Sequence, residues 1–489
     1  MLTGGTFQQY IDGAFEDGEA RFASLDPATG TPWAEMPEAR EGDVNRAVAA
    51  ARRAFEAGPW PAMTATARGK LLARLAELIA THAGALAEIE TRDTGKIIRE
   101  TSAQIAYVAD YYRYYAGLAD KIEGAHLPID KPDLEVWTRR EPVGVGAAIV
   151  PWNSQLFLAA VKIGPALAAG CTLVVKASED GPGPLLAFAR LVHEAGFPPG
   201  VVNVITGFGP TCGAALTRHP GVDHIAFTGG PNAGRAVVRN SAETLASTSL
   251  ELGGKSPFIV FADADLESAV NAQVAGIFAA AGQSCVAGSR LIVERSIKDA
   301  FLARLKARAE AVRIGAPLDM ATEVGPLATE RQRAHVADLI ARSEAAGARR
   351  LTGGPVEGPG WYWRPTILDC DGTDAPALSE EFFGPVLSAV SFETEAEAVR
   401  LANDTPFGLA SGVFTRDLAR GHRMIRAIRA GIVWVNTYRA VSPIAPFGGF
   451  GLSGQGREGG LAAALDYTRT KTVWLRTSDD PIPDPFVMR

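Results

Sequence analysis

The chain has 489 residues, of which 47% are hydrophobic and 21% are charged, and its formal net charge at pH 7 is −7. This composition is that of a folded globular protein and excludes disorder, and the length predicts two or three domains. The acidic balance argues against nucleic acid or an anionic membrane surface as a partner, because both attract basic proteins.

The cysteines at positions 171, 212, 285 and 370 lie far apart and form no C-x-x-C pair, so neither a metal site nor a redox dithiol is expected. The opening MLTGGTFQQYIDG has no apolar core typical of a signal peptide. The most apolar stretch, Phe157–Val175, contains Lys162 and Pro165 and therefore predicts a buried helix, turn and strand instead of a membrane span. We expect a cytoplasmic protein.

Hydrophobic periodicity predicts helices in the first part of the chain. One helix is expected to start at an N-cap, Asp43, and to run to Glu56, a second to cover Ala65–Arg92, and a third to cover Ala103–Ala119. From Val143 onward short β-rich runs alternate with helical stretches, among them Leu156–Ala169 and Pro184–Glu194. The expected strands are Gly146–Val150, Thr172–Lys176, Val201–Thr206, His224–Thr228 and Thr248–Leu252.

A second series of strands follows glycines 253 and 254, and another glycine-rich joint is expected at Gly353–Gly360. The expected strands of this series are Pro257–Phe261, Arg290–Glu294, Leu387–Phe392, Gly412–Thr415 and Ile432–Asn436. Strand–helix–strand spacing of this kind is typical of parallel sheets. The predicted fold class is therefore α/β, with two lobes that meet near residue 253. The tail Thr468–Arg489 begins with a β-rich run that is expected to add a strand elsewhere.

Three side chains are candidates for catalysis. Cys285 lies between two glycines in GQSCVAG, which opens space around its thiol, although a cysteine is more often inert core. Glu251 ends a predicted strand, where a carboxylate is costly unless it is paired or used, and a structural salt bridge remains the alternative. Asn153 follows another strand and could donate to an oxyanion, or could be a turn residue.

Two further patterns indicate a dinucleotide. The loop GFGPTCG, with Gly209 and Gly213, follows a predicted strand and precedes a helix, as phosphate-binding loops do, but it is weak evidence in a glycine-rich chain. Lys176 and Glu179 follow another strand end. A carboxylate there suits ribose hydroxyls and favours NAD over NADP, because it would repel a 2′-phosphate; a solvated charge pair is the alternative.

Taken in order, these motifs closely resemble the NAD(P)-dependent aldehyde dehydrogenase family over nearly the whole chain. The blocks that carry the resemblance are PWN at 151–153, KASE at 176–179, GFGPTCG at 207–213, FTGG at 227–230, ELGGKSP at 251–257, GQSC at 282–285, EEFFGPV at 380–386, NDTPFGL at 403–409 and PFGGFGLSGQGREGG at 446–460. Glycines 230 and 451 stand where many relatives carry serine and lysine.

The resemblance implies a role for each matching position. Cys285 would be the nucleophile that forms a thiohemiacetal and then a thioester, Asn153 would hold the oxyanion, and Glu251 would activate the water that hydrolyses the thioester. Lys176 and Glu179 would hold the adenosine ribose. The remaining expected cofactor residues are Ile149, Val150, Pro151, Trp152, Gly209, Gly213, Phe227, Gly229, Gly230, Leu252, Glu381 and Phe383.

The resemblance also implies a domain organisation. Residues 1–121 and 142–252 would bind NAD, and residues 253–452 would form the catalytic domain. Residues 122–141 and 468–489 would form a small β element that joins subunits into a homodimer or homotetramer.

The substrate is expected to be a small-molecule aldehyde of medium size or with an aromatic group, because Val161 and Val441 stand where some relatives have large aromatics. Arg439 could select an aldehyde with a carboxylate, or could be a solvated arginine. The expected tunnel residues are Tyr107, Leu158, Val161, Ser284, Val286, Arg439, Val441 and Phe447.

Two other functions compete with this interpretation. In a CoA-acylating relative, CoA would take the thioester in place of water, but such relatives tend to lack the glutamate. A non-catalytic nucleotide-binding relative would typically have lost the cysteine or the glutamate, and this chain keeps both together with Asn153.

Overall fold

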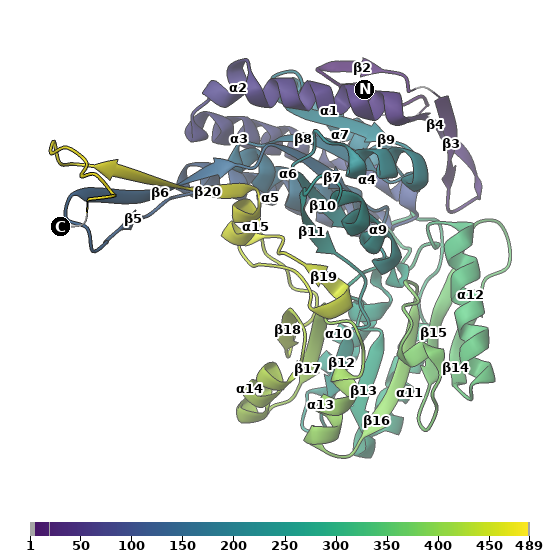
Figure 1. The fold of residues 1–489 in the computed structure, drawn as a ribbon. Coiled ribbons are helices and arrows are strands. Elements are labelled where there is room, and N and C mark those ends of the chain that lie inside the picture. Colours follow the sequence, from purple (N-terminus) through teal and green to yellow (C-terminus); the bar gives the residue numbers. More distant parts are fainter. Residues whose placement is uncertain (1–4, 19, 488–489) are drawn as a thin grey trace.

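The computed structural model describes residues 5–18 and 20–487, in two large sheets with their helices and a thin arm that projects to one side (Figure 1). Within these residues the strand order of the first sheet is β19 (Gly454–Gln455), β11 (Ser247–Glu251), β10 (His224–Thr228), β7 (Val145–Ile149), β8 (Thr172–Ala177), β9 (Val202–Thr206), β1 (Gln9–Ile11) and β2 (Ala14–Glu16). The order of the second sheet is β14 (Arg349–Pro355), β15 (Trp363–Asp369), β16 (Val386–Phe392), β13 (Arg290–Glu294), β12 (Pro257–Val260), β17 (Ala410–Phe414) and β18 (Ile432–Val435).

The centre of the first sheet is parallel: β7 pairs with β8 on one side and with β10 on the other. The chain proceeds from β7 to β8 and β9, and then returns to place β10 and β11 on the opposite side of β7. Such a reversal of strand order opens a crevice at the carboxyl ends of the two strands that flank it. Ligands of this lobe are therefore expected beyond β7 and β10, where the loops after Ile149 and Thr228 begin.

Helices cover both faces of the first sheet, which explains why β7 to β10 are buried along their whole length. On one face lie α1 (Glu41–Glu56), α8 (Ala214–Arg218) and α9 (Pro231–Ser241). The other face is covered by α3 (Ala65–Thr81), α4 (Ala83–Thr94), α5 (Ile98–Leu118), α6 (Gln155–Ala169) and α7 (Gly183–Ala195). The short α2 (Pro59–Ala62) follows α1, and α15 (Gly460–Asp466) packs on α6.

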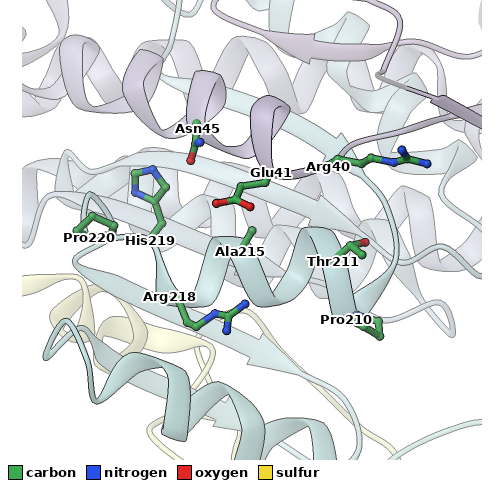
Figure 2. A pocket seen from close by; sticks show the side chains of 9 residues that line it. All are labelled: Arg40, Glu41, Asn45, Pro210, Thr211, Ala215, Arg218, His219 and Pro220. Atoms are coloured by element: carbon green, nitrogen blue, oxygen red, sulfur yellow. The ribbon is translucent and has the colours of Figure 1, made fainter.

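The start of α1 and the helix α8 border a surface hollow of about 620 Å³ (Figure 2). None of the residues predicted for the site is among those that line it, which are Arg40, Glu41, Asn45, Pro210, Thr211, Ala215, Arg218, His219 and Pro220.

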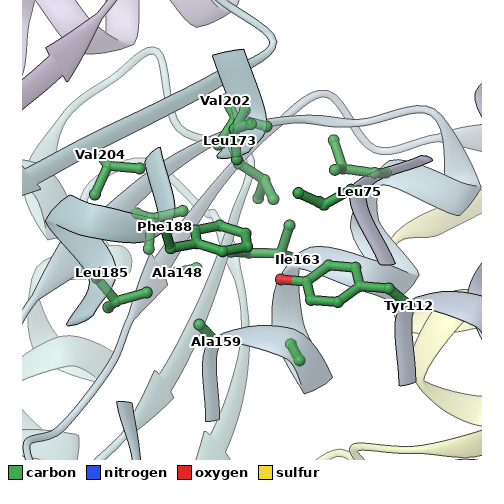
Figure 3. Close-up of a cluster of buried hydrophobic side chains, with 14 of the residues drawn as sticks. Leu75, Tyr112, Ala148, Ala159, Ile163, Leu173, Leu185, Phe188, Val202 and Val204 are labelled. Atoms are coloured by element: carbon green, nitrogen blue, oxygen red, sulfur yellow. The ribbon is translucent and has the colours of Figure 1, made fainter. Parts of the chain in front are cut away.

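The alternation of side chains along the central strands divides the core of the first lobe into two layers. In β7, Ala148 points into the layer shared with α3 to α7, whereas Ala147 and Ile149 point into the layer under α1 and α9. Figure 3 shows the first layer, in which side chains of β8 and β9 meet Ile163 of α6 and Phe188 of α7. The helix α6 is buried on nearly every side, as its composition predicts.

The second sheet carries α10 (Leu266–Ile277), α11 (Lys298–Glu310), α12 (Glu330–Ala345), α13 (Glu395–Asn403) and α14 (Leu418–Ala427). The projecting arm is a three-stranded sheet of β20 (Thr468–Arg476), β6 (Leu134–Pro142) and β5 (His126–Leu127) (Figure 1). As predicted, the β-rich run of the tail adds a strand elsewhere: β20 pairs with β6, which lies far from it in sequence. None of the helices in the described part of the chain is long and apolar enough to cross a membrane.

The predicted fold class is confirmed, but several expected elements at the start of the chain are wrong. Strands precede the first helix: β1, β2 and the hairpin of β3 (Ala20–Asp26) and β4 (Thr31–Glu38). The first helix begins at Glu41, and Asp43 lies inside it, where its carboxylate accepts a hydrogen bond from the Arg40 backbone N–H at 3.1 Å. A carboxylate can cap a helix from the third helical position as well as from the N-cap position. The sequence alone therefore did not decide at which residue α1 begins.

Two other boundaries differ from the prediction. The expected helix over residues 65–92 is two helices that meet at His82, whose backbone (φ −102°, ψ 13°) leaves the helical path. The expected joint at Gly353–Gly360 begins inside β14, where Gly353 and Gly354 have φ of +96° and +137° and form irregularities in the pairing with β15, and the rest of it lies in the connection from β14 to β15. Glycines with such angles break the β register locally without ending the strand.

Candidate active site

A cavity of about 690 Å³ contains Cys285 and Asn153 in its wall. Its walls come from α5, from the first half of α6, from the loop between α10 and β13, and from β18 and the segment that follows it, residues 432–447. Segments from both lobes therefore meet here, at the carboxyl ends of β7 and β18.

The loop that carries Cys285 is held in an unusual backbone conformation. In the short helix η3 (Ala279–Gly282), Ala280 and Ala281 have φ of 54° and 51°, in the left-handed region that alanine rarely occupies. The Glu100 carboxylate of α5 accepts hydrogen bonds from the Ala280 N–H at 2.9 and 3.1 Å. Gly282 has no room for a side chain, because a Cβ would lie 2.1 Å from the Gly384 carbonyl oxygen. Strain of this size is typical of functional loops.

Asn153 lies in the turn between β7 and α6, and its side chain reaches the same loop. Its Nδ2 donates to the Gln283 carbonyl oxygen at 3.0 Å, and Oε1 of Gln283 accepts from the Ala328 N–H at 2.9 Å. These bonds hold the amide two residues from Cys285. An amide N–H so close to a nucleophile can stabilise negative charge on a substrate oxygen.

Glu251 ends β11, with its side chain 5% exposed, and neither carboxyl oxygen has a hydrogen-bond partner among the described residues. Burial, and next the negative charge of Glu458, raise the pKa of Glu251 well above its ordinary value, while Lys162 and Arg457 oppose the shift. A buried carboxyl group without partners is costly. It is also a group whose pKa lies closer to that required of a general base at neutral pH.

Lys162 and Glu458, which the sequence analysis did not assign to the site, form a buried ion pair beside Glu251. Nζ of Lys162 also donates to Oγ1 of Thr228 at 2.6 Å, and Thr228 is the neighbour of Glu251 in the adjacent strand. Lys162 is the single charged residue of an apolar helix, a signal that could have marked it. The pairing with Glu458, 296 residues away, had no signal in the sequence.

Cys285 is half-buried and faces the cavity. Burial raises the pKa of its thiol to about 12, and the negative charges of Glu251, Glu381 and Glu458 add to the shift. At neutral pH the sulfur is therefore a thiol, and a nearby base has to remove its proton before it can attack.

The expected cofactor residues gather beyond β7, β8 and β10. Nζ of Lys176 lies 3.0 Å from the Glu179 carboxylate, whose other oxygen accepts from the Gly209 N–H at 3.3 Å. Gly213 lies against the aliphatic part of Lys176. Burial acts to raise the pKa of Glu179, but the charge of Lys176 and the hydrogen bonds that the carboxylate accepts together lower it, so Glu179 is an anion at the end of β8.

On the other side, Trp152 and Phe383 lie edge to face with ring centroids 5.4 Å apart. Glu381 is half-buried, accepts the Gly254 N–H at 3.0 Å, and has a pKa raised to about 7 by burial. The other predicted cofactor residues lie at the same edge: Ile149 and Phe227 within β7 and β10, Val150 and Pro151 after β7, Gly229 against the Phe227 ring, and Leu252 against Gly234 of α9.

The start of α9 fits a phosphate. Its N-cap, Gly230, has open space where a Cβ would be and offers no side chain to the first turn; Pro231 has no N–H group, so the N–H groups that an anion can meet here are those of Asn232 and Ala233. Gly451, the other departure from the family pattern, has φ +59°, and a Cβ there would lie 2.6 Å from the Pro406 carbonyl oxygen. Its backbone therefore favours glycine over lysine.

All eight predicted tunnel residues line the cavity: Tyr107, Leu158, Val161, Ser284, Val286, Arg439, Val441 and Phe447. The hydroxyl of Tyr107 donates to the Val441 carbonyl oxygen at 2.9 Å, which joins α5 to the segment after β18. The sequence analysis missed other wall residues, among them Lys96, Glu100, Gln104, Phe157 and Trp434. They lie in elements without a motif, so only the folded chain brings them here.

The fold and the site together define the class of the protein. It is an α/β enzyme with a cysteine in a cavity between its two lobes, and beside that cavity lies the crevice at the strand ends where such folds bind nucleotides. Residues 15–473 match the model of the aldehyde dehydrogenase family, and the chain therefore belongs to that family. The family, the fold class and the enzyme class predicted from the sequence are confirmed.

Individual relatives match this chain over nearly their full length. The chain is 67% identical over 485 residues to (Z)-2-((N-methylformamido)methylene)-5-hydroxybutyrolactone dehydrogenase of Acinetobacter baylyi, with 99% of each chain covered. A crystal structure from Burkholderia cenocepacia, described as a putative aldehyde dehydrogenase, has a TM-score of 0.96 at 43% identity and covers 98% of this chain and 99% of its own. An NAD+ complex of aldehyde dehydrogenase from Bacillus cereus has a TM-score of 0.95 at 41% identity, with 97% of each chain covered.

Proposed function

We propose that this protein oxidises an aldehyde to the carboxylic acid with NAD as hydride acceptor, through a covalent thioester on Cys285. The observation that carries the proposal is the arrangement around the cavity. Cys285 and Asn153 share its wall, and the buried carboxyl group of Glu251 lies close enough to raise the pKa of the thiol. These are a nucleophile, an oxyanion donor and a general base.

In the first half of the reaction, Glu251 takes the proton of the Cys285 thiol and the sulfur bonds to the aldehyde carbon. The carbonyl oxygen becomes an oxyanion held by the Asn153 amide and by the backbone N–H of Cys285. NAD, when bound, would supply the hydride acceptor for this carbon, which leaves a thioester on Cys285. After Glu251 has released its proton, it removes another from a water, whose oxygen bonds to the acyl carbon as the bond to sulfur breaks.

For the cofactor, Lys176 and Glu179 are proposed to hold the adenosine ribose, the start of α9 the diphosphate, and Glu381 the nicotinamide ribose. The ionised Glu179 supports NAD over NADP, because it would repel a 2′-phosphate. The NAD+ complex of the Bacillus cereus relative supports NAD as the cofactor.

For the substrate, the Acinetobacter baylyi relative is named for a 5-hydroxybutyrolactone, and we propose that this chain acts on the same class. Such a compound is a five-membered cyclic hemiacetal whose ring opens to a 4-oxo carboxylic acid, and it is the open-chain aldehyde that Cys285 can attack. The size of the cavity, about 690 Å³, suits a substituted acid of this kind better than acetaldehyde. It also agrees with the medium-sized aldehyde expected from the sequence.

Two features of the protein beyond the reaction are also proposed. A cytoplasmic location is supported by four unpaired cysteines, one of them the nucleophile, which need a reducing compartment. Assembly into a homodimer or homotetramer through residues 122–141 and 468–489 is supported by β20, an edge strand whose Trp474 and Leu475 are about half-exposed.

The test is NADH formation by the purified protein from 5-hydroxybutyrolactone and a panel of neutral aldehydes, with NAD and NADP in parallel. The wild type should turn over with NAD in preference to NADP. Cys285→Ala should lower kcat by about 10³-fold or more, because the covalent route is removed. Cys370→Ala, which removes a buried thiol of the second lobe, is the matched control and should retain activity.

Two results would contradict the proposal. Turnover that begins only when CoA is added would identify the acylating reaction instead. NAD binding without NADH formation under either condition would identify a non-catalytic relative.

A further inference from the structure

The charged side chains in the cavity wall differ in how much of their hydrogen-bonding capacity is already used within the protein. Nζ of Lys96 donates to Oε1 of Gln104 at 2.9 Å and to Oγ of Ser154 at 2.6 Å. Glu100 is bonded to the Ala280 N–H and Glu458 to Lys162. Each of these charges is therefore bound to the protein itself.

Arg439 is different. It is half-buried in the cavity wall. Within the described residues its guanidinium makes one hydrogen bond, from Nη1 to the Ala275 carbonyl oxygen at 3.0 Å. A guanidinium has five N–H groups in a planar fork, so within the described residues most of this donor set is unused. A carbonyl oxygen also does not neutralise the charge, as a carboxylate would.

The backbone of Arg439 is conformationally strained. Arg439 has φ of 60°, in the left-handed region that non-glycine residues rarely occupy. Its charge also reaches the reacting atoms: burial raises the pKa of the Cys285 thiol and Arg439 opposes that rise, while burial lowers the pKa of Lys96 and Arg439 adds to that lowering. Arg439 is thus a strained, under-used cation within electrostatic reach of the nucleophile.

We propose that Arg439 binds the carboxylate of a 4-oxo acid substrate and thereby selects the ring-opened form of the hydroxybutyrolactone over neutral aldehydes. The inference rests on the proposed function and extends it to a residue that determines specificity. Arginine suits this task because its fork can donate two parallel hydrogen bonds to one carboxylate.

Ring opening creates an anion that such a group can bind. The bond between the ring oxygen and the hemiacetal carbon breaks, the hydroxyl proton passes to water, the hemiacetal carbon becomes the aldehyde, and the ring oxygen stays on the other carbonyl as a carboxylate. Two carbons separate the aldehyde from that carboxylate, so a cation near Cys285 meets the anion while the aldehyde faces the sulfur. Ion pairing with Arg439 also opposes ring closure, because the closed form has no carboxylate to offer.

Two other charged groups lie in the same wall: the Glu100 carboxylate, which repels a substrate carboxylate, and the Lys96 ammonium, which attracts it.

The test compares 4-oxobutanoate with its methyl ester, which lacks the negative charge and carries one additional methyl group, by NADH formation. Wild-type enzyme should give a higher kcat/KM for the acid than for the ester. In Arg439→Gln the ratio of the two values should fall at least tenfold, which corresponds to about 1.4 kcal/mol. Arg439→Lys, which keeps the charge but not the fork, should lie between them, and Arg426→Gln, an exposed arginine of α14, should keep the wild-type ratio.

A wild-type ratio near one, or an unchanged ratio in Arg439→Gln, would overturn the inference, with the proposed NAD-dependent oxidation still standing. Because the strained backbone could affect folding, Tm of each variant is measured alongside the ratio, and the ester serves as an internal reference for the amount of active enzyme. Loss of turnover with every aldehyde in the wild type would instead be a failure of the proposed function.

Discussion

The carboxyl group of Glu251 has no hydrogen-bond partner in the described structure although it is almost completely buried. Burial and the neighbouring Glu458 raise its pKa, and its own charge in turn helps to raise that of Cys285. The two groups are therefore coupled: when the carboxyl is ionised it disfavours the thiolate, and it is also the group that can receive the thiol proton. A base and a nucleophile arranged in this way exchange a proton without carrying two negative charges at once.

Glu251→Gln tests this role through pH. A general base works when it is deprotonated, so wild-type kcat should rise with pH through a pKa above that of an exposed glutamate. The glutamine variant should lose this rise and should lower kcat by about 10²- to 10³-fold, and its first burst of NADH should be slower than that of the wild type, because Glu251 also takes the thiol proton. Stopped-flow and steady-state kinetics between pH 5 and 9 measure both.

The same shift makes a prediction for stability with a defined sign. A carboxyl group whose pKa is higher in the folded than in the unfolded state binds its proton more tightly when folded, so its contribution to the unfolding free energy decreases as pH rises through the raised pKa. Glu251→Gln should therefore lose less Tm than the wild type between pH 5 and 9. An equal loss in both proteins, together with an unchanged pH profile of kcat, would refute the assignment.

At the scale of the element, the segment before Cys285 is held by the rest of the molecule and not by its own preferences. Ala280 and Ala281 adopt left-handed angles, and Glu100 of α5 binds the N–H group of Ala280. Gly282 meets the Gly384 carbonyl so closely that no larger residue fits. The position of the thiol thus depends on α5 and on the chain before β16 as much as on its own loop.

Ala280→Gly should separate strain from function. Left-handed alanine costs about 1 kcal/mol that glycine does not pay, so the variant should unfold with an equal or higher free energy, by up to about 1 kcal/mol. The looser loop should lower kcat several-fold with little change in NAD affinity. Chemical denaturation and steady-state kinetics measure the two effects.

The matched control is Ala272→Gly, in the regular helix α10, where glycine should destabilise by about 0.5–1 kcal/mol. If both variants destabilise equally, the left-handed conformation of Ala280 is not a source of strain in solution.

At the scale of the whole molecule, the chain returns to the first lobe after completing the second sheet. The short β19 pairs with β11 next to Glu251, and α15 packs on α6. Oγ of Ser453 donates to the Gly253 carbonyl oxygen at 2.7 Å and accepts the Gly408 N–H at 3.0 Å. This return places Glu458 beside Lys162, so the environment of the general base depends on the folding of nearly the entire chain.

The projecting arm predicts how subunits join. β20 has a paired neighbour only on the β6 side among the described residues, and its Trp474 is 57% exposed. An edge strand with an exposed aromatic is an unusual feature for an isolated monomer. Trp474→Asp should therefore shift the protein to a smaller oligomer, detected by analytical ultracentrifugation.

Leu418→Asp serves as the control, because Leu418 is a similarly exposed apolar residue, 76% exposed, on α14 of the second lobe. It should leave the oligomer unchanged. A wild-type protein that sediments as a monomer would contradict the assembly proposal.

The sequence alone determined the family, the α/β class, the central strands and the candidate catalytic trio, because each depends on residues close together in the chain. GQSC and ELGGKSP are local patterns, and the buried parallel strands are continuous apolar runs. β1 and β2 escaped prediction because they have only three residues each, too few to show a period. The start of the first helix was misplaced because Asp43 caps it from within.

Only the tertiary structure decided what surrounds those residues. The pair of Lys162 and Glu458, the hydrogen bonds of Glu100 to the loop before Cys285 and the bond of Arg439 to the Ala275 carbonyl oxygen all join segments far apart in sequence. Raised pKa values and strained angles arise from burial and from neighbours, and neither is a property of a residue type or of its spacing in the chain. For this reason the class of reaction, and Arg439 as a candidate for binding a carboxylate, could be predicted from the sequence, whereas the unused donors and the strained backbone of Arg439 became visible only in the folded molecule.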